Sequence, residues 1–433
     1  MKGMTLRAMT QAVNGIYHGN GEDYDKEITA ITIDSRKVAE GGLFIAIKGE
    51  RSDGHDFIGQ CFEKGAACVI SEKELPDEER SYIQVESSLQ ALKDLALLYR
   101  NNLDVKVVGI TGSVGKTSTK ETISSVLSEK YRVLKTLGNF NNEIGLPLTV
   151  FRLTEDDEVA VLEMGISDFG EMDRLSKIAQ PDICVITNIG FCHLENLGTR
   201  DGILKAKTEI FNHMNPDGIV IVNGDDDKLS TISQVHGKRP LVFGISNKDG
   251  VYADNIKSLG LDGTSFTIHG IKTSDNYSTF DLTVPVPGHH MVYNAMAAAL
   301  VGSVLGLSSI EIERGVKNLK TIAGRNNIIK ENGFTIIDDC YNANPVSMKA
   351  SLDVLDTAIG RKVAILGSMF ELGENEKQMH YDVGMYLGTK DIDVLITAGD
   401  LAAQIAAGTR AYIDTNYNAH GLSLIHISEP TRP

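Results

Sequence analysis

The sequence predicts an α/β protein built from three domains. Its 433 residues are too many for one ordinary core, because a domain usually holds roughly 100 to 200 residues. Short apolar runs alternate with helical stretches along most of the chain, which is typical of mostly parallel sheets with crossover helices. The pattern changes character twice, and these changes set the predicted domains. They are 1–103, 104–320 and 321–421, followed by a tail at 422–433.

Residues 1–103 predict a small α/β domain. Three short runs typical of strands lie between Gly, Asp and Ser turns, namely "ITAITID", "GGLFIAIKG" and "AACVIS". The domain closes with "SLQALKDLALLYRNN", whose apolar residues recur at helical spacing. We therefore expect a short sheet followed by one long helix.

Residues 104–320 predict a larger domain with a mostly parallel sheet. A strand, a glycine turn and a helix come first, and the buried runs "EVAVLEMG", "PDICVITNIG" and "GIVIVNGDDD" follow. The runs "GTSFTIHG" and "STFDLTVPVPG" then alternate apolar with polar residues, which indicates an antiparallel insert. A helix rich in small residues, "NAMAAALVGSVLG", completes this domain.

Residues 321–421 predict a second open, Rossmann-like α/β unit. Its strands are expected in "FTIIDDCYN", "RKVAILGSM" and "DVLITAGD". A sheet that ends there is a strand or two short, so we expect an incomplete domain. The final stretch "LSLIHISEPTRP" runs from an apolar burst into two prolines. We interpret it as a non-native tail with neither strand nor helix.

Composition excludes several classes of protein. The 58 acidic and 42 basic residues give a net charge of −16, so no broad positive field favours nucleic acid. No apolar run approaches the roughly 18 residues of a spanning helix, and the N-terminus lacks a signal-peptide core. We therefore expect no membrane insertion and a cytoplasmic location. The five cysteines are scattered without zinc-site spacing.

The stretch "VKVVGITGSVGKTSTKE" predicts a phosphate-binding loop. A strand leads into Gly112 and Gly115, and Lys116 and Thr117 then open a helix. Glycines let backbone N–H groups approach phosphate oxygens, the lysine supplies a cation, and the threonine can ligate Mg²⁺. The usual pattern would place glycine at the position of Ile110, so a chance glycine turn is the alternative.

Two polar residues follow neighbouring strands of the same predicted sheet. Glu163 ends "EVAVLEMG", where a carboxylate could supply a second metal contact, although a surface glutamate is the alternative. His193 in "NIGFCHLENLG" could reach the same edge. From the residues alone, a structural histidine is the favoured interpretation.

Kinase and GTPase functions are not supported. The fragments "IAIK" and "DFG" occur, but the glycine loop follows the lysine and no H-R-D stretch exists. A GTPase would need aspartate after "NKD", where this chain has Gly250.

A series of motifs resembles the Mur ligase family in order and spacing, from about residue 4 to about residue 420. They are "IDSRKVAEGGLFIAIKGERSDGHDFI", "GITGSVGKTSTKE", "GNFNNEIGLPLTV", "LEMGISDFGEM", "NIGFCHLENLG", "KAKTEIF", "GHHMVYNAMAAA", "AGRNN", "DDCYNANPVSMKASL" and "ILGSMFELGENEKQMH". The pair "DDCYNANP" and "LGSMFELG" is the most specific.

The resemblance implies an ATP-dependent amide-bond ligase. Its γ-phosphate would activate the terminal carboxylate of UDP-N-acetylmuramoyl-tripeptide, and the amine of D-alanyl-D-alanine would attack the acyl phosphate. We expect a monomer whose outer domains close over the central one. A related ligase with another acceptor, a folylpolyglutamate-type synthetase and a nucleotide-binding chain without turnover are the alternatives.

The resemblance also implies the site residues. Catalytic roles fall to Lys116, His193, Lys207 and Arg325. Two Mg²⁺ ions would be held by Thr117, Glu163, His193 and Lys207, the last as a carbamate, with an unmodified lysine or a modified Lys205 as alternatives. ATP contacts would come from Gly112, Ser113, Val114, Gly115, Lys116, Thr117, Ser118, Asn294, Arg325, Asp339, Tyr341, Asn342 and Asn344.

Substrate contacts are implied for the N-terminal domain and one central loop. They are Ser35, Arg36, Lys48, Asp53, Gly54 and His55 for the UDP-sugar, and Asn139, Asn141 and Asn142 for the muramoyl peptide. Ligand-free asparagine turns are common, and "YNANP" also fits a turn with a proline stop. Met291 and Val114 depart from the family pattern because they lack polar side chains.

Overall fold

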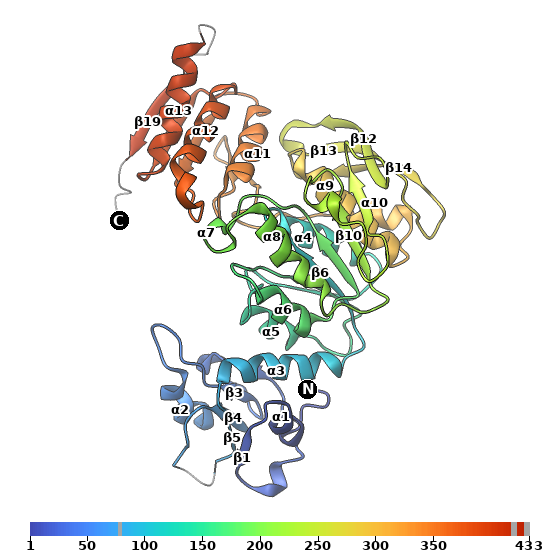
Figure 1. Cartoon of the computed structure of the whole chain (residues 1–433), viewed down its shortest axis with the longest axis vertical. Coiled ribbons are helices and arrows are strands. Elements are labelled where there is room, and N and C mark those ends of the chain that lie inside the picture. The colour runs from blue at the N-terminus through green and yellow to red at the C-terminus, as the bar shows by residue number, and fades with distance from the viewer. Residues whose placement is uncertain (77–79, 417–421, 428–433) are drawn as a thin grey trace.

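The structure is a computed structural model that describes residues 1–76, 80–416 and 422–427. Three α/β units follow one another along its long axis (Figure 1). This arrangement confirms the predicted fold class. No helix among the described residues is long and apolar enough to span a bilayer.

The N-terminal unit is a five-stranded sheet with three helices. The strands are β1 Ile16–His18, β2 Ile31–Thr32, β3 Leu43–Ile45, β4 Cys68–Ser71 and β5 Tyr82–Gln84, in the order β1-β5-β4-β3-β2. The helices are α1 Leu6–Ala12, α2 Ile58–Glu63 and α3 Ser88–Asn101. The predicted runs contain β2, β3 and β4. Strands β1 and β5 lie outside these runs.

The central unit contains one nine-stranded sheet in the order β14-β13-β12-β11-β10-β9-β6-β8-β7. The strands are β6 Lys106–Thr111, β7 Val133–Lys135, β8 Val159–Glu163, β9 Ile183–Ile186, β10 Ile219–Asn223, β11 Leu241–Gly244, β12 Val251–Ser258, β13 Thr264–His269 and β14 Thr279–Val284. Strands β6 to β12 pair in parallel, and β12, β13 and β14 pair antiparallel. The expected antiparallel insert is confirmed.

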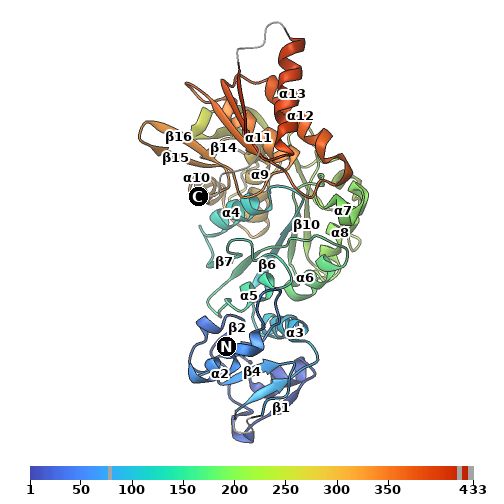
Figure 2. The same ribbon diagram turned by 90° about the vertical axis from the view of Figure 1, so that its left-hand side faces the viewer.

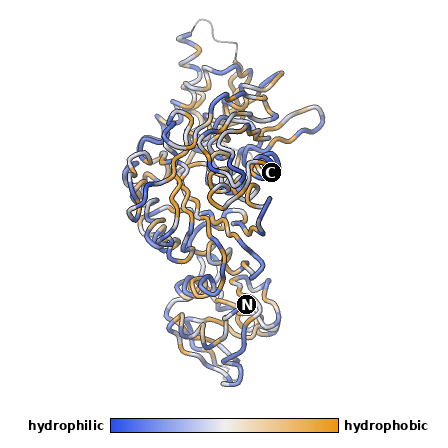
Figure 3. Tube along the Cα trace, turned by 90° about the vertical axis from the view of Figure 1, so that its right-hand side faces the viewer, coloured by the Kyte–Doolittle hydropathy of each residue, from blue (hydrophilic) through white to orange (hydrophobic). Residues whose placement is uncertain are grey.

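Helices cover both faces of this sheet. They are α4 Lys116–Leu127, α5 Gly145–Val150, α6 Glu171–Ala179, α7 Leu194–Leu197, α8 Arg200–Thr208, α9 His290–Val304 and α10 Ser309–Lys317. Val107 on β6 joins a core with α3, α5, α6 and α8, while the next residue, Val108, joins a second core with α4, α9 and α10. Figure 3 shows hydrophobic segments along the strands in the middle of this unit.

The C-terminal unit has its own core and a parallel sheet of β17 Val363–Gly367, β18 Val394–Ala398 and β19 Ser423–Ile427. Its helices are α11 Pro345–Asp356, α12 Glu376–Gly388 and α13 Ala402–Thr415. A separate hairpin of β15 Asn327–Glu331 and β16 Phe334–Asp338 extends to one side (Figure 2).

Two sequence predictions about this unit are wrong. The run beginning at Phe334 was expected in the open sheet, but it pairs with β15 instead. Asn332 and Gly333, with φ of 50° and 80°, form the kind of Asn-Gly turn that closes a tight hairpin. The last stretch was expected to lack a strand, yet Ser423–Ile427 pairs with β18. Its β-branched Ile425 and Ile427 suit such a strand.

Residues 428–433 of the predicted tail lie outside the described residues, and its non-native origin stays a prediction.

Candidate active site

The phosphate loop lies between β6 and α4, at the carboxyl edge of the parallel strands. Gly112, with φ of 152°, lies so close to β9 that an added Cβ would be 2.0 Å from Thr187 Oγ1. Gly115 precedes α4 with φ of 81°. The first internal hydrogen bond of α4 runs from Thr119 N–H to Gly115 O, 2.8 Å. The N–H groups of its first turn, on residues 116–118, therefore remain for an anion.

Residues after β9 hold this loop in shape. Asn188 accepts the Ser113 N–H at its carbonyl (3.0 Å) and the Val114 N–H at its side-chain oxygen (2.9 Å). Thr187 Oγ1 donates to Val114 O at 2.7 Å. The loop N–H groups of Ser113 and Val114 are thus engaged within the protein. Sequence reasoning missed Asn188, although it lies two residues after β9 in the run "PDICVITNIG".

Lys116 bends back over its own loop. Its Nζ donates to Gly112 O at 2.8 Å. This places the ammonium group beside the first-turn N–H groups of α4. The cation and the helix dipole therefore both attract an anion to the same position.

Glu163 is a buried carboxylate with one free oxygen. The residue is 2% exposed, and it ends β8 opposite Ile110 of β6. Thr117 Oγ1 and Asn141 Nδ2 donate to Glu163 Oε1 at 3.2 and 2.8 Å. Among the described residues, Glu163 Oε2 has no hydrogen-bond partner. A carboxylate oxygen left unpaired beside a threonine hydroxyl suits a hard cation such as Mg²⁺.

Lys120 is a buried cation near this carboxylate that the sequence analysis missed. It is fully buried, and its Nζ donates to Thr136 O at 2.8 Å and pairs with Glu121 at 3.0 Å. Its distance to Glu163 Oε2 is 3.9 Å. Lys120 therefore offsets the negative charge of Glu163 without a hydrogen bond to the free oxygen. Its position one helical turn after Lys116 was the available signal.

Lys207 on α8 is a fully buried lysine, and in the described part of the chain its Nζ has no hydrogen-bond partner. Burial lowers the pKa of Lys207 to about 7, and repulsion from Lys116 adds to the effect. A neutral amine is the form that adds CO₂, so the site fits a carbamate. Lys205, the alternative, is exposed, with its Nζ 5.7 Å from the ring centre of Phe169.

His193 lies at the same edge, in a loop with φ of 50°. Burial lowers the pKa of His193, and repulsion from Lys207 and Lys116 acts in the same direction. Its Nδ1 lies 2.8 Å from Oε2 of Glu371, in the C-terminal unit. Thr117, Glu163, Lys116, Lys207 and His193 thus gather at one edge of the central sheet.

The predicted nucleotide residues of the C-terminal unit form a second, more exposed group. The Arg325 guanidinium carbon lies 4.2 Å from the ring centre of Tyr341, which is 51% exposed. Asp339 accepts hydrogen bonds from Asn326 N–H (3.1 Å) and the Ser351 hydroxyl. The side-chain oxygen of Asn342 accepts the N–H of Ala343 at 2.9 Å.

Asn344 and Asn294 have structural partners. Asn344 caps α11 by accepting two N–H groups, at 3.0 and 2.9 Å. The Asn294 oxygen accepts from Thr119 Oγ1 at 3.0 Å, and its amide contacts the sulfur of Met291 at 3.3 Å. This oxygen lies next to Gly115 of the phosphate loop.

The asparagine loop, residues 139–142, joins Glu163 to α5. Asn141 accepts Gly165 N–H at its carbonyl (2.8 Å) while its amide holds Glu163, and its own N–H donates to Asn139 O at 2.7 Å. The Asn142 oxygen accepts the N–H groups of Ile144 and Gly145 at the start of α5. Only Asn141 of the three directly reaches the predicted metal site.

The predicted UDP-sugar residues form a compact cluster in the N-terminal unit. Asp53 accepts the His55 N–H (3.0 Å), pairs with its ring (2.6 Å) and binds Lys73 (3.0 Å). The hydrogen bond from the His55 N–H, the His55 ring and Lys73 lower the pKa of Asp53. Gly54 packs against the backbone of Ile47, where a Cβ would be 2.7 Å away.

The other three belong to neighbouring turns of this unit. Arg36 pairs with Asp34 at 2.8 Å, and Ser35 O accepts a hydrogen bond from Lys64 Nζ at 2.8 Å. The backbones of Lys48 and Asp53 form an isolated antiparallel β-bridge. No hydrogen bond or ion pair links this cluster to the phosphate loop in residues 1–76, 80–416 and 422–427.

Comparison with protein families matches three consecutive Mur ligase descriptions. They are "Mur ligase family, catalytic domain" at residues 27–100, "Mur ligase middle domain" at 110–302 and "Mur ligase, glutamate ligase domain" at 324–428. Together they span most of the chain.

Known proteins and structures agree with these matches. The chain is 40% identical over 421 residues to UDP-N-acetylmuramoyl-tripeptide–D-alanyl-D-alanine ligase of Bacillus subtilis, covering 96% of this chain and 90% of the relative. The Escherichia coli enzyme of that name is 34% identical, covering 94% and 89%.

Solved structures of similar proteins include MurF from Acinetobacter baumannii, with a TM-score of 0.86, 33% identity and 98% and 96% coverage. MurF from Thermotoga maritima in complex with ADP has a TM-score of 0.78, 31% identity and 92% and 93% coverage. The chain therefore belongs to the Mur ligase family.

Proposed function

We propose that this protein is an ATP-dependent ligase that joins D-alanyl-D-alanine to UDP-N-acetylmuramoyl-tripeptide. The products are UDP-N-acetylmuramoyl-pentapeptide, ADP and phosphate, in the synthesis of peptidoglycan precursors. One observation carries the proposal, namely identity of 40% to a ligase of that name over 96% of this chain. The phosphate loop beside a buried, half-paired carboxylate supports the chemistry.

The reaction needs an activated carboxylate. A carboxylate does not react with an amine until one oxygen becomes a good leaving group, and transfer of the γ-phosphate provides one. ATP and the peptide carboxylate are both anions, so the site must offset negative charge as they meet. Lys116 and the N–H groups at the start of α4 supply that positive potential.

The residues at the sheet edge fit two Mg²⁺ ions. Thr117 and Glu163 would hold the first, and the unpaired Glu163 Oε2 is the observation that fits it. His193 and the carbamate of Lys207 would hold the second. Mg²⁺, when bound, supplies further charge compensation between the two anionic substrates.

The carbamate would form from the neutral amine of Lys207. Its Nζ attacks the carbon of CO₂, a new N–C bond forms and one proton leaves to solvent. The pKa of about 7 and the unpaired Nζ support this modification, because near neutral pH much of the amine is then unprotonated. The product is an anionic oxygen donor in place of a buried cation.

The remaining predicted residues would bind nucleotide and sugar. Asn294, Arg325, Asp339, Tyr341, Asn342 and Asn344 would contact ATP, and the Asp53 and His55 cluster would bind the UDP-sugar. Because these groups belong to different units, we propose that the outer units close on the central one and exclude water from the acyl phosphate.

We also propose the domain bounds 1–103, 104–320 and 321–421, a monomeric and cytoplasmic enzyme, and no binding of nucleic acid. The separate sheets of the three units support the bounds, the net charge of −16 supports the absence of nucleic acid, and the family membership supports the rest.

Phosphate release tests the function. We would incubate Mg-ATP and UDP-N-acetylmuramoyl-tripeptide with and without D-alanyl-D-alanine, using this chain and Lys116→Ala. We expect release that requires both substrates and falls by on the order of 10² to 10³ in the variant, about 3 to 4 kcal/mol. Equal release without D-alanyl-D-alanine, or with an unrelated dipeptide, would contradict the proposed acceptor.

A further inference from the structure

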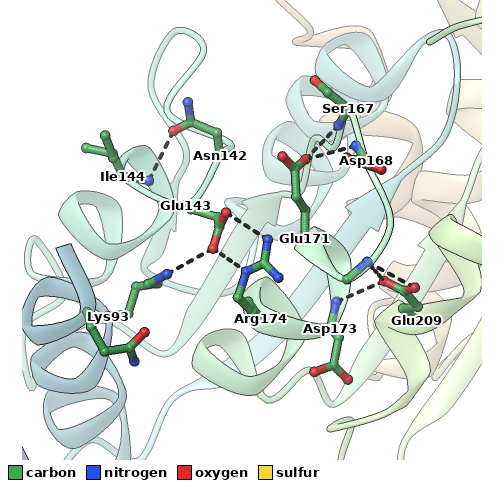
Figure 4. A network of polar contacts seen from close by, with 12 residues as sticks. Lys93, Asn142, Glu143, Ile144, Ser167, Asp168, Glu171, Asp173, Arg174 and Glu209 are labelled. Atoms are coloured by element: carbon green, nitrogen blue, oxygen red, sulfur yellow. Dashed lines mark hydrogen bonds and ion pairs between the residues drawn. The ribbon is translucent and has the colours of Figure 1, made fainter. Parts of the chain in front are cut away.

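A cluster of three charged residues lies behind the asparagine loop. Glu143 binds Lys93 at 3.1 Å, and both carboxylate oxygens bind the guanidinium of Arg174, one of them at 3.0 Å (Figure 4). Lys93 lies on α3, Glu143 in the loop before α5 and Arg174 on α6. One carboxylate thus ties together three segments that are far apart in the sequence.

The cluster is partly buried, so it is more than a loose surface contact. The side chains of Lys93 and Glu143 are 13% and 25% exposed. Burial would raise the pKa of Glu143, but the hydrogen bonds from Arg174 and Lys93 together lower it below its ordinary value. The carboxylate is therefore charged and fixed between two cations. A two-oxygen contact to a guanidinium also fixes orientation.

Glu143 is not needed to cap α6. Glu171 accepts the N–H groups of Ser167 and Asp168, and Glu209 accepts those of Gly170 and Asp173 (Figure 4). Glu209 therefore satisfies the start of this helix, and Glu171 satisfies the turn before it. The contacts of Glu143 serve the asparagine loop instead.

The loop carries this anchoring to the metal carboxylate. Asn142 turns its oxygen inward to the start of α5, and Asn141 points its amide to Glu163 at 2.8 Å. Glu143 directly follows these two residues. The ion pairs of Glu143 fix one end of the loop to α3 and α6. Asn141, two residues earlier, binds the carboxylate of Glu163.

We propose that Glu143 is a positioning residue for the metal carboxylate Glu163. It acts through Asn141, and through Lys93 it also couples the position of α3, the helix that closes the N-terminal unit, to the metal site. The inference rests on the proposed function in one respect, that Glu163 binds Mg²⁺. Groups that orient metal ligands typically change metal affinity by about 10- to 100-fold.

The test uses Mn²⁺ in place of Mg²⁺. Electron paramagnetic resonance measures the binding of Mn²⁺ to this protein in the presence of ADP. Glu143→Gln keeps the shape of the side chain and removes its charge. We expect its dissociation constant for Mn²⁺ to rise about tenfold, at the low end of that range because Glu143 acts through a neighbour. Asn141→Ala should produce a rise of at least the same size.

The matched control is Glu129→Gln. Glu129 also joins two segments, since it accepts from Arg314 and, at 3.0 Å, from Asn318, but it follows the far end of α4. We expect Glu129→Gln to lower the melting temperature about as much as Glu143→Gln does. Its Mn²⁺ affinity should nevertheless stay within twofold of that of the unaltered protein. Equal Mn²⁺ affinity in Glu143→Gln and Glu129→Gln would overturn the positioning role.

Two further variants separate the possible failures. Arg174→Met should weaken Mn²⁺ binding alone but add little to Glu143→Gln, because both remove the same contact. If the losses of Mn²⁺ affinity in the two single variants add fully in the double variant, the ion pair has no role in positioning. This comparison holds even where one variant folds poorly. If Glu163→Gln leaves Mn²⁺ binding unchanged, the metal site itself is wrong and the positioning role fails with it. Ligase activity that persists in that case would leave the proposed function standing.

Discussion

The central and C-terminal units contribute to the proposed ATP site in different ways. In the central unit, Glu163 and Lys207 are buried ionisable groups, each with an atom that makes no hydrogen bond within the described residues, and the sheet register fixes the place of Glu163. In the C-terminal unit, which has a core of its own, the ring that Arg325 stacks on, Tyr341, is half exposed. The central half is prepared before ligands arrive. The C-terminal half depends on how the two units approach each other.

The largest expected effect comes from breaking the prepared half. Glu163→Gln removes the charge that we assign to Mg²⁺, so the turnover number for phosphate release should fall by on the order of 10² to 10³. Tyr341→Ala should mainly raise the KM for ATP, by about tenfold or less, because its ring is half exposed. Steady-state kinetics of both variants check the contrast. Equal losses in turnover number would contradict it.

Alanine substitutions at one glycine of the central unit and one of the C-terminal unit test the same difference between the two units. In Gly112→Ala the new Cβ would lie 2.0 Å from Thr187 Oγ1, so the loop must move and the contact of Thr187 with Val114 must change. We expect ATP affinity to fall by about tenfold or more, which is about 1.4 kcal/mol or more. Calorimetric titration with an ATP analogue measures it.

The control is Gly367→Ala at the end of β17, where an added Cβ meets nothing within 4 Å. Its nucleotide affinity should stay within twofold of the unaltered protein. A comparable loss in Gly367→Ala would mean that the C-terminal unit is as tightly built around the nucleotide as the central one.

The buried lysine predicts a smaller effect that depends on pH. Lys207 has a pKa of about 7 in the folded chain, against 10.5 ordinarily. Between these values the unfolded chain binds the extra proton, so stability rises with pH across that window, and the full penalty applies below pH 7. Lys207→Met removes the penalty. Its stability advantage should therefore shrink from pH 7.5 to pH 9 by on the order of 2 kcal/mol.

Melting temperatures in CO₂-free buffer measure this difference. Lys205→Met is the matched control, because Lys205 is exposed on the same helix and its replacement relieves no burial of an amine. A constant advantage for Lys207→Met would show that the amine is not forced towards its neutral form.

The sequence predicts the central half of the site better than its surroundings, for a physical reason. A phosphate loop and a strand-end carboxylate are local patterns, and parallel strands bring their carboxyl ends to one edge. Lys120, Asn188 and Glu143 act through contacts between distant segments, which no local spacing encodes. Lys120 reaches Thr136 O, and Asn188 reaches the loop 74 residues away.

The errors in the C-terminal unit have a similar origin. A short apolar run identifies a strand but not its partner, so Phe334–Asp338 was assigned to the wrong sheet. The Asn-Gly pair between β15 and β16 was the local signal that names the partner. In Ser423–Ile427, the prolines downstream outweighed the apolar run that indicates a strand, although prolines beyond a strand's end do not prevent its pairing.

The smallest expected effect concerns the contact between the two units. Glu371 reaches His193 at 2.8 Å from a backbone with φ of 62°, and its side chain is 63% exposed. An exposed polar contact of this kind contributes at most about 1 kcal/mol, so Glu371→Gln should lower the turnover number by less than about fivefold. Small-angle scattering should show a wider spread of dimensions without ligands and the same compact form with ATP analogue and nucleotide substrate. A loss of 10² or more would instead place Glu371 among the groups that touch the reacting atoms, and the C-terminal half would then be as prepared as the central one.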